Sequence, residues 1–417
     1  MENHVRSKGS IISLYGFLMF LVIFVAVSCD KEDDDQNSDD VYLVDYSSSN
    51  LWPVDFIKSS LSGLVSEYPG ASEIIDFARY GVQVYSIEYE THYLDSVITV
   101  SGLVCMPVAD EEFPVISFQN GTNTAHDNAP TKDPFNEAFV LLQFLASNGY
   151  IILIPDYIGF GSSESILHPY YHRLNTNNAV IDMLHALKEL QLKDDILAES
   201  NDSTFLMGYS QGGWATLSVL DEIENGETEF NVTAASCGAG AYNLMTMANY
   251  IFDVGNYPGP LYLPYFLYSQ IDMGLLTDPL EKYFKSPYFE KIPRLFNGSY
   301  TNGEVNSELT DQITDLVTDD LIDNFAAGQD FSTLRQLLQE NSVSAWNSTA
   351  KIQFYHGSAD LTVPSAQSSA IYQNFINAGT DSETVQFFEM NGLDHDTGLI
   401  PWGISTLSWF NELRDNN

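Results

Sequence analysis

The chain has 417 residues, of which 44% are hydrophobic and 18% are charged, so it can build a sizeable core and global disorder is excluded. Its 57 Asp and Glu residues against 16 Lys and Arg residues give a formal net charge of −41 at pH 7. This charge excludes a nucleic-acid partner, because such a surface repels phosphate. The three cysteines are too few for a disulfide framework.

The N-terminus has the features of an export signal. Arg6 and Lys8 lie before an uninterrupted uncharged run over 11–28, and this run ends in small residues directly before Cys29. These features predict a secretory signal peptide over 1–28, although a run of 18 residues could also remain as a membrane anchor. The Ala-Val-Ser-Cys ending resembles a bacterial lipobox. This resemblance implies export, lipidation of Cys29 and anchoring to the bacterial outer membrane.

The residues after Cys29 are strongly acidic. The segment 30–40 contains seven carboxylates and one lysine, and neighbouring like charges keep a chain extended. We therefore expect the lipidated cysteine and an acidic tether to occupy 29–45, with membrane contact only through the lipid anchor. The lysine followed by acidic residues resembles the surface-export signal of Bacteroidetes lipoproteins, and a plain solvated linker is the alternative interpretation.

The remainder, 46–417, is predicted to form one domain in which strands and helices alternate. Period-two alternation over 82–90 and 97–106 predicts antiparallel strands. Alternating strands and helices then predict the α/β class, with a mostly parallel central sheet flanked by helices. Short apolar runs predict strands, and apolar residues at helical spacing predict helices. The strands are expected at 114–118, 150–156, 204–207, 232–235, 352–355 and 385–388, and the helices at 137–148, 180–190 and 214–220.

A long insertion interrupts this alternation at about 245–345. It contains the turn signal Pro258-Gly259-Pro260 and then several acidic amphipathic helices. An insertion of this length is usually functional, so we interpret it as a helical cap or lid. A helical excursion without a function is the alternative.

The strongest chemical signal is Gly208-Tyr-Ser210-Gln-Gly212, which follows a predicted strand and precedes a predicted helix. In a Gly-x-Ser-x-Gly elbow the glycines keep Cβ atoms out of a tight strand-to-helix turn, and the serine is exposed at the carboxyl end of the strand. This context predicts Ser210 as a nucleophile. A glycine-bounded tight turn is the structural alternative.

A serine hydroxyl needs a base to remove its proton, and that base needs an acid to orient it. In hydrolases with this elbow the chain order is Ser, then Asp or Glu, then His. Only His356 and His395 follow Ser210. His356 lies just after the 352–355 strand and cannot follow an acid there, whereas His395 lies in a glycine-bounded loop after the 385–388 strand. His395 is therefore the predicted base.

Asp360 is the predicted acid. It lies in the loop after a buried strand, where its carboxylate can reach the imidazole of His395. Asp394 and Asp396 flank that histidine, but neighbours in sequence rarely orient one another's side chains. An Asx turn or a helix cap is the structural alternative for Asp360.

The oxyanion of an acyl-transfer intermediate needs backbone N–H donors. One is expected from Gln211, directly after the nucleophile at a helix N-terminus. The second is expected from Thr122 in the Asn120-Gly121-Thr122 loop, where Gly121 allows close approach of the backbone. An ordinary turn is the alternative for this loop.

The chain resembles the α/β-hydrolase superfamily and, within it, the secretory lipase family. Members of that family often have His-Gly-Thr where this sequence has Asn-Gly-Thr. The resemblance covers roughly 80–415 and implies an α/β-hydrolase fold with a cap and a serine-based lipase or esterase activity. The segments that carry it are 101–103, 118–122, 155–162, 208–212, Asp360 and His395.

The leading hypothesis is a lipase or esterase that acts on ester or lipid-like small molecules through an acyl-enzyme on Ser210. A surface peptidase or amidase with the same three residues, and a surface-binding lipoprotein without activity, remain alternatives. No metal site, phosphate loop or dinucleotide motif is present in the sequence, so we expect no metal and no other cofactor. Cys105 and Cys237 are expected to be buried free thiols.

Overall fold

The computed structural model describes residues 42–63, 65 and 71–416, which belong to the compact unit Val41–Asn417. The predicted signal peptide, Cys29 and most of the predicted tether lie outside the described residues. Within the described part of the chain, the helices are too short or too polar to cross a membrane. Cys105 and Cys237 are both buried and free, as predicted.

The folded part begins earlier than the sequence indicated. The tether was expected to reach residue 45, but strand β1 starts at Leu43, so that boundary was wrong. Leu43 is buried, and its N–H donates to a carboxylate oxygen of Glu189 at 2.7 Å. Strand pairing and this long-range hydrogen bond order the segment despite its charged surroundings.

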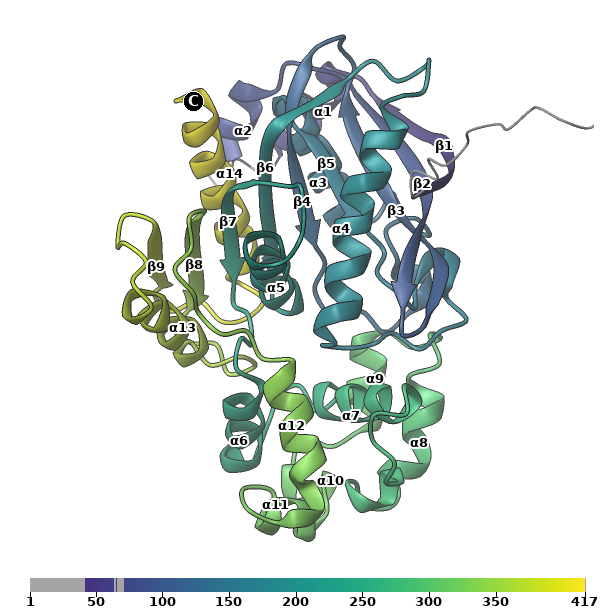
Figure 1. The fold of residues 1–417 in the computed structure, drawn as a ribbon, viewed down its shortest axis with the longest axis vertical. Coiled ribbons are helices and arrows are strands. Elements are labelled where there is room, and N and C mark those ends of the chain that lie inside the picture. Colours follow the sequence, from purple (N-terminus) through teal and green to yellow (C-terminus); the bar gives the residue numbers. More distant parts are fainter. Residues whose placement is uncertain (1–41, 64, 66–70, 417) are drawn as a thin grey trace, which may run out of the picture. The chain divides into compact units, whose positions relative to one another are not determined.

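The described residues form a nine-stranded sheet with the order β1-β2-β3-β5-β4-β6-β7-β8-β9 (Figure 1). The neighbours from β1 to β5 pair antiparallel, and those from β5 to β9 pair parallel, so the predicted mostly parallel sheet is present. The strands are β1 (Leu43–Trp52), β2 (Val82–Tyr93), β3 (Ser96–Pro107), β4 (Glu112–Gln119), β5 (Ile151–Pro155), β6 (Glu199–Tyr209), β7 (Val232–Gly238), β8 (Lys351–Gly357) and β9 (Val385–Met390).

Helices cover both faces of the sheet. Along β6, Leu206 packs into one core, whereas Phe205 and Met207 pack into the other, because successive strand residues point to opposite faces. The first core is covered by α4 (Arg173–Leu190), α5 (Gln211–Asn225) and α13 (Ala366–Asn377). The second is covered by α1 (Val54–Ser62), α3 (Glu137–Leu145) and α14 (Leu399–Asp415), and α2 (Ala71–Phe77) contacts α14.

A group of helices connects β7 to β8, in the region where the insertion was expected. In Figure 1 these helices gather beyond the carboxyl ends of the parallel strands. We call the segment from α6 to α12 the cap. Its helices are α6 (Leu244–Val254), α7 (Tyr262–Asp272), α8 (Tyr288–Leu295), α9 (Asn302–Glu308), α10 (Ile313–Leu316), α11 (Asp319–Asn324) and α12 (Ser332–Glu340).

Candidate active site

Ser210 occupies a strained turn between β6 and α5. Its backbone has φ 60° and ψ −122°, a positive-φ conformation that costs a non-glycine residue free energy. A Cβ at Gly208 would collide with the carbonyl oxygen of Gly212, and a Cβ at Gly212 would collide with the carbonyl oxygen of Gln119. The two glycines of the motif therefore let β6, α5 and the end of β4 approach closely enough to expose the serine.

We expect Gly212→Ala to destabilise the protein by about 1–3 kcal/mol, because the added methyl group has no space beside the Gln119 carbonyl. Urea unfolding would measure this loss. Gly303→Ala is the matched control, since a Cβ at Gly303 meets nothing within 4 Å. An equal stability of the two variants would contradict the close approach of β4 and α5.

The structure brings the three predicted catalytic side chains together. Ser210 follows β6, Asp360 lies in the loop after β8, and His395 lies in the loop after β9. The Oγ of Ser210 is 2.9 Å from Nε2 of His395, and Nδ1 of His395 is 2.6 Å from Oδ2 of Asp360. The carboxylate can only accept, so Nδ1 carries the hydrogen and Nε2 is left to accept from the serine hydroxyl.

The carboxylate of Asp360 is buried and heavily hydrogen-bonded. Its Oδ1 accepts from the N–H groups of Thr362 and Val363 at 2.9 and 2.8 Å. Burial raises the pKa of this carboxyl group, but hydrogen bonds from His356, His395 and the Val363 N–H outweigh burial and lower the pKa to about 2. Asp360 therefore stays ionised and keeps the imidazole of His395 in one tautomer.

This shift predicts a pH-dependent contribution to stability. The folded pKa of Asp360 lies below its ordinary value of 3.8, so the ionised carboxylate stabilises the fold above about pH 4 and this stabilisation is lost as the pH falls towards 2. Urea unfolding of the wild type and Asp360→Asn should show a difference in unfolding free energy that shrinks by about 2 kcal/mol between pH 6 and pH 2. A difference that stays constant over this range would contradict the lowered pKa.

His356 is a residue whose role the sequence did not reveal. It is fully buried, and its Nε2 lies 2.8 Å from the Val363 carbonyl oxygen and 3.3 Å from Oδ2 of Asp360. Since a carbonyl only accepts, Nε2 carries a hydrogen, which lies near both oxygens. From the sequence, His356 was weighed only as the catalytic base, and His395 was preferred. Its position four residues before Asp360 was the signal that could have indicated a contact with that carboxylate.

The predicted oxyanion residues lie around the same cleft as the nucleophile. Gln119 at the end of β4 pairs with Gly208 on β6, so the loop after β4 lies beside the elbow. Gly121, Thr122 and Gln211 line one cleft together with Ser210 and His395. Gln211 is the first residue of α5, where backbone N–H groups have no partner within the helix.

Residues distant in the chain hold the Thr122 loop and Gln211, the two predicted sources of oxyanion donors. Asn302 in the cap donates to the Thr122 carbonyl at 2.7 Å. His168 is buried, and burial lowers its pKa to about 4. Its Nδ1 donates to the Ile158 carbonyl at 2.7 Å, so its Nε2 accepts from Nε2 of Gln211 at 2.9 Å. The sequence did not indicate a role for His168, because it precedes Ser210 and the base was expected after the nucleophile.

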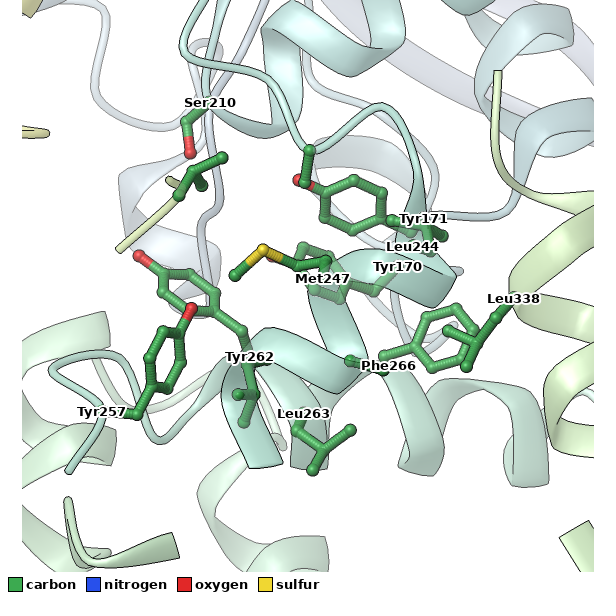
Figure 2. Close-up of a pocket in the computed structure, with 14 residues that line it drawn as sticks. Tyr170, Tyr171, Ser210, Leu244, Met247, Tyr257, Tyr262, Leu263, Phe266 and Leu338 are labelled. Carbon is green, nitrogen blue, oxygen red and sulfur yellow. The ribbon is translucent and has the colours of Figure 1, made fainter. Parts of the chain in front are cut away.

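An apolar cavity leads from Ser210 into the cap. Figure 2 shows Ser210 at one side of this cavity and aromatic and aliphatic side chains around the rest of it. The cap supplies much of the lining, and Tyr170 and Tyr171, which precede α4, supply another part. Such a lining favours a hydrocarbon chain over a charged group.

Comparisons with known proteins identify the fold. No protein-family model and no curated protein sequence matches the chain. A Legionella pneumophila protein named as a hydrolase is 25% identical, with a TM-score of 0.79 over 89% of this chain and 98% of the other. The rice cell wall degrading esterase LipA from Xanthomonas oryzae is 22% identical, with a TM-score of 0.74 over 89% and 97%. Candida antarctica lipase A in its closed state is 16% identical, with a TM-score of 0.64 over 90% and 82%.

These likenesses and the strand order confirm the predicted fold class. The chain has an α/β-hydrolase fold, with its candidate site at the carboxyl ends of the parallel strands. Among the described residues, no group of three or more His, Cys, Asp and Glu side chains could hold a metal ion.

Proposed function

We propose that the protein is a carboxylic ester hydrolase of the lipase or esterase type, similar to the secretory lipases. The observation that carries this proposal is the hydrogen-bonded relay of Ser210, His395 and Asp360 beside an apolar cavity. The esterase and lipase among the structures with this fold support the same class of reaction.

In this mechanism Ser210 Oγ attacks the acyl carbon while Nε2 of His395 takes its proton. Asp360 stabilises the imidazolium that forms, and the N–H groups of Gln211 and Thr122 bind the oxyanion. His395 then gives its proton to the leaving alcohol. Water, activated by the same imidazole, hydrolyses the acyl-enzyme and returns the hydroxyl to Ser210.

A fluorophosphonate probe tests the nucleophile, and p-nitrophenyl esters from acetyl to palmitoyl test the reaction. We expect the probe to label the wild-type protein at Ser210 and the esters to be hydrolysed. Ser210→Ala should lose both activities. Full activity in Ser210→Ala would overturn the assignment of the nucleophile. Turnover of amides with esters untouched would indicate a peptidase or amidase, and a complete absence of labelling would favour a binding protein.

We also propose that the protein is exported and lipid-anchored through Cys29, an inference that rests on the lipobox-like sequence. Metabolic labelling with a palmitate analogue should label the full-length chain in a bacterial host with a lipoprotein pathway. Cys29→Ala should lose the label, whereas Cys105→Ala should keep it because Cys105 is buried. Equal labelling of the two variants would contradict this assignment.

A further inference from the structure

Two cavities meet at the nucleophile. The apolar cavity is lined largely by the cap, whereas His395, Thr122 and Gln211 line the cleft, and both cavities reach Ser210. Among the described residues, only Ser210 and Tyr262 line both. Tyr262 therefore marks the boundary at which one part of a bound ester passes into the apolar cavity and the other stays in the cleft.

The cap fixes the ring of Tyr262 at this boundary. Tyr262 is the first residue of α7, and its N–H donates to the Gly259 carbonyl at 3.2 Å. A Cβ at Gly259 would collide with the ring of Tyr262, so glycine at this position makes room for it. The ring of Tyr257 packs edge-on at a centroid distance of 6.4 Å. The turn at 258–260 thus makes room for an aromatic ring that lines both cavities.

The hydroxyl group of Tyr262 makes no hydrogen bond to the described residues, whereas the hydroxyl of its neighbour Tyr257 donates to the Thr362 carbonyl at 2.9 Å. In Figure 2 the ring of Tyr262 extends towards the side of the cavity where Ser210 lies. Burial, with smaller effects of Asp396 and Asp360, raises the pKa of Tyr262 to about 12, so the phenol keeps its proton and can donate it in a hydrogen bond.

We propose that Tyr262 is a specificity-determining residue that divides the acyl side of the site from the alcohol side. Its ring walls the entrance of the apolar cavity, and its hydroxyl donates a hydrogen bond to the bound ester. This inference rests on the proposed ester hydrolysis. The lining of both cavities contains no Lys or Arg, and Asp156 and Asp396 line the cleft, so the substrate class that fits is an ester without an anionic group and with an aliphatic acyl chain.

Two substitutions separate the hydroxyl from the ring. Tyr262→Phe keeps the ring and should lower kcat/KM about fivefold for both p-nitrophenyl acetate and p-nitrophenyl octanoate, with their ratio unchanged. Tyr262→Ala removes the ring and should lower the octanoate-to-acetate ratio of kcat/KM about tenfold, because the longer chain loses a wall of its cavity. Tyr268→Phe, on the same helix but outside both cavities, is the matched control and should leave both values unchanged.

Fluorophosphonate labelling and thermal melting of each variant report whether the site is still formed. An unchanged octanoate-to-acetate ratio in a folded, labelled Tyr262→Ala protein would overturn the role of the ring. Wild-type kinetics in Tyr262→Phe would overturn the role of the hydroxyl, and this variant stays informative if the alanine variant does not fold. Absence of ester turnover in the wild type overturns the proposed function itself, which distinguishes the two failures.

Discussion

Replacing His395 by alanine should lower kcat for p-nitrophenyl esters by about 10⁵- to 10⁶-fold. The imidazole is the group within hydrogen-bond reach of the Ser210 hydroxyl, at 2.9 Å, and without it the alcohol has no base at this position. The same histidine must protonate the leaving alcohol and activate water, so each chemical step suffers. Steady-state kinetics at saturating substrate, together with burst measurements of acyl-enzyme formation, would measure the loss.

His92→Ala is a suitable control for this prediction. His92 is exposed near the end of β2 and lines neither of the two cavities at Ser210, so its substitution should leave kcat unchanged. If His395→Ala retained more than about 1% of wild-type kcat, another group would act as the base, because loss of the true base is expected to lower kcat far more than this.

Asp360→Asn should lower kcat by about 10⁴-fold with little change in KM. The asparagine oxygen can still accept from the N–H groups of Thr362 and Val363, which leaves its amide to face Nδ1 of His395. An amide donor favours the imidazole tautomer with hydrogen on Nε2, and that nitrogen can then no longer accept the proton of Ser210. The expected loss of kcat therefore comes from the wrong tautomer of His395 and not from weaker substrate binding.

Asp394→Asn serves as the comparison, because Asp394 is exposed and bonds Thr397 rather than His395. Its kcat should stay close to that of the wild type. A large loss of kcat in Asp394→Asn with a small loss in Asp360→Asn would show that Asp394, not Asp360, is the acid. The hydrogen bond of 2.6 Å between His395 and Asp360 would then have another role.

Several elements could be predicted because their cause is local. The fully buried strand Ile151–Pro155 reads as one apolar run, and Gly208 is required within the strand-to-helix turn itself, because a Cβ there would collide with the Gly212 carbonyl. The start of β1 at Leu43 could not be predicted in this way. Its order comes from pairing with β2 and from Glu189, a residue 146 positions away.

The sequence alone predicted the strand-and-helix alternation, a candidate nucleophile and, through chain order, a candidate base and acid. Only the tertiary structure decided how these parts meet, since β4 precedes β5 in the chain yet lies between β5 and β6 in the sheet. It alone placed His356 against Asp360, His168 against Gln211, and Tyr262 in the lining of the same cavity as Ser210. The reason is physical: periodicity records which face of an element is buried, whereas these contacts depend on which distant elements pack against that face.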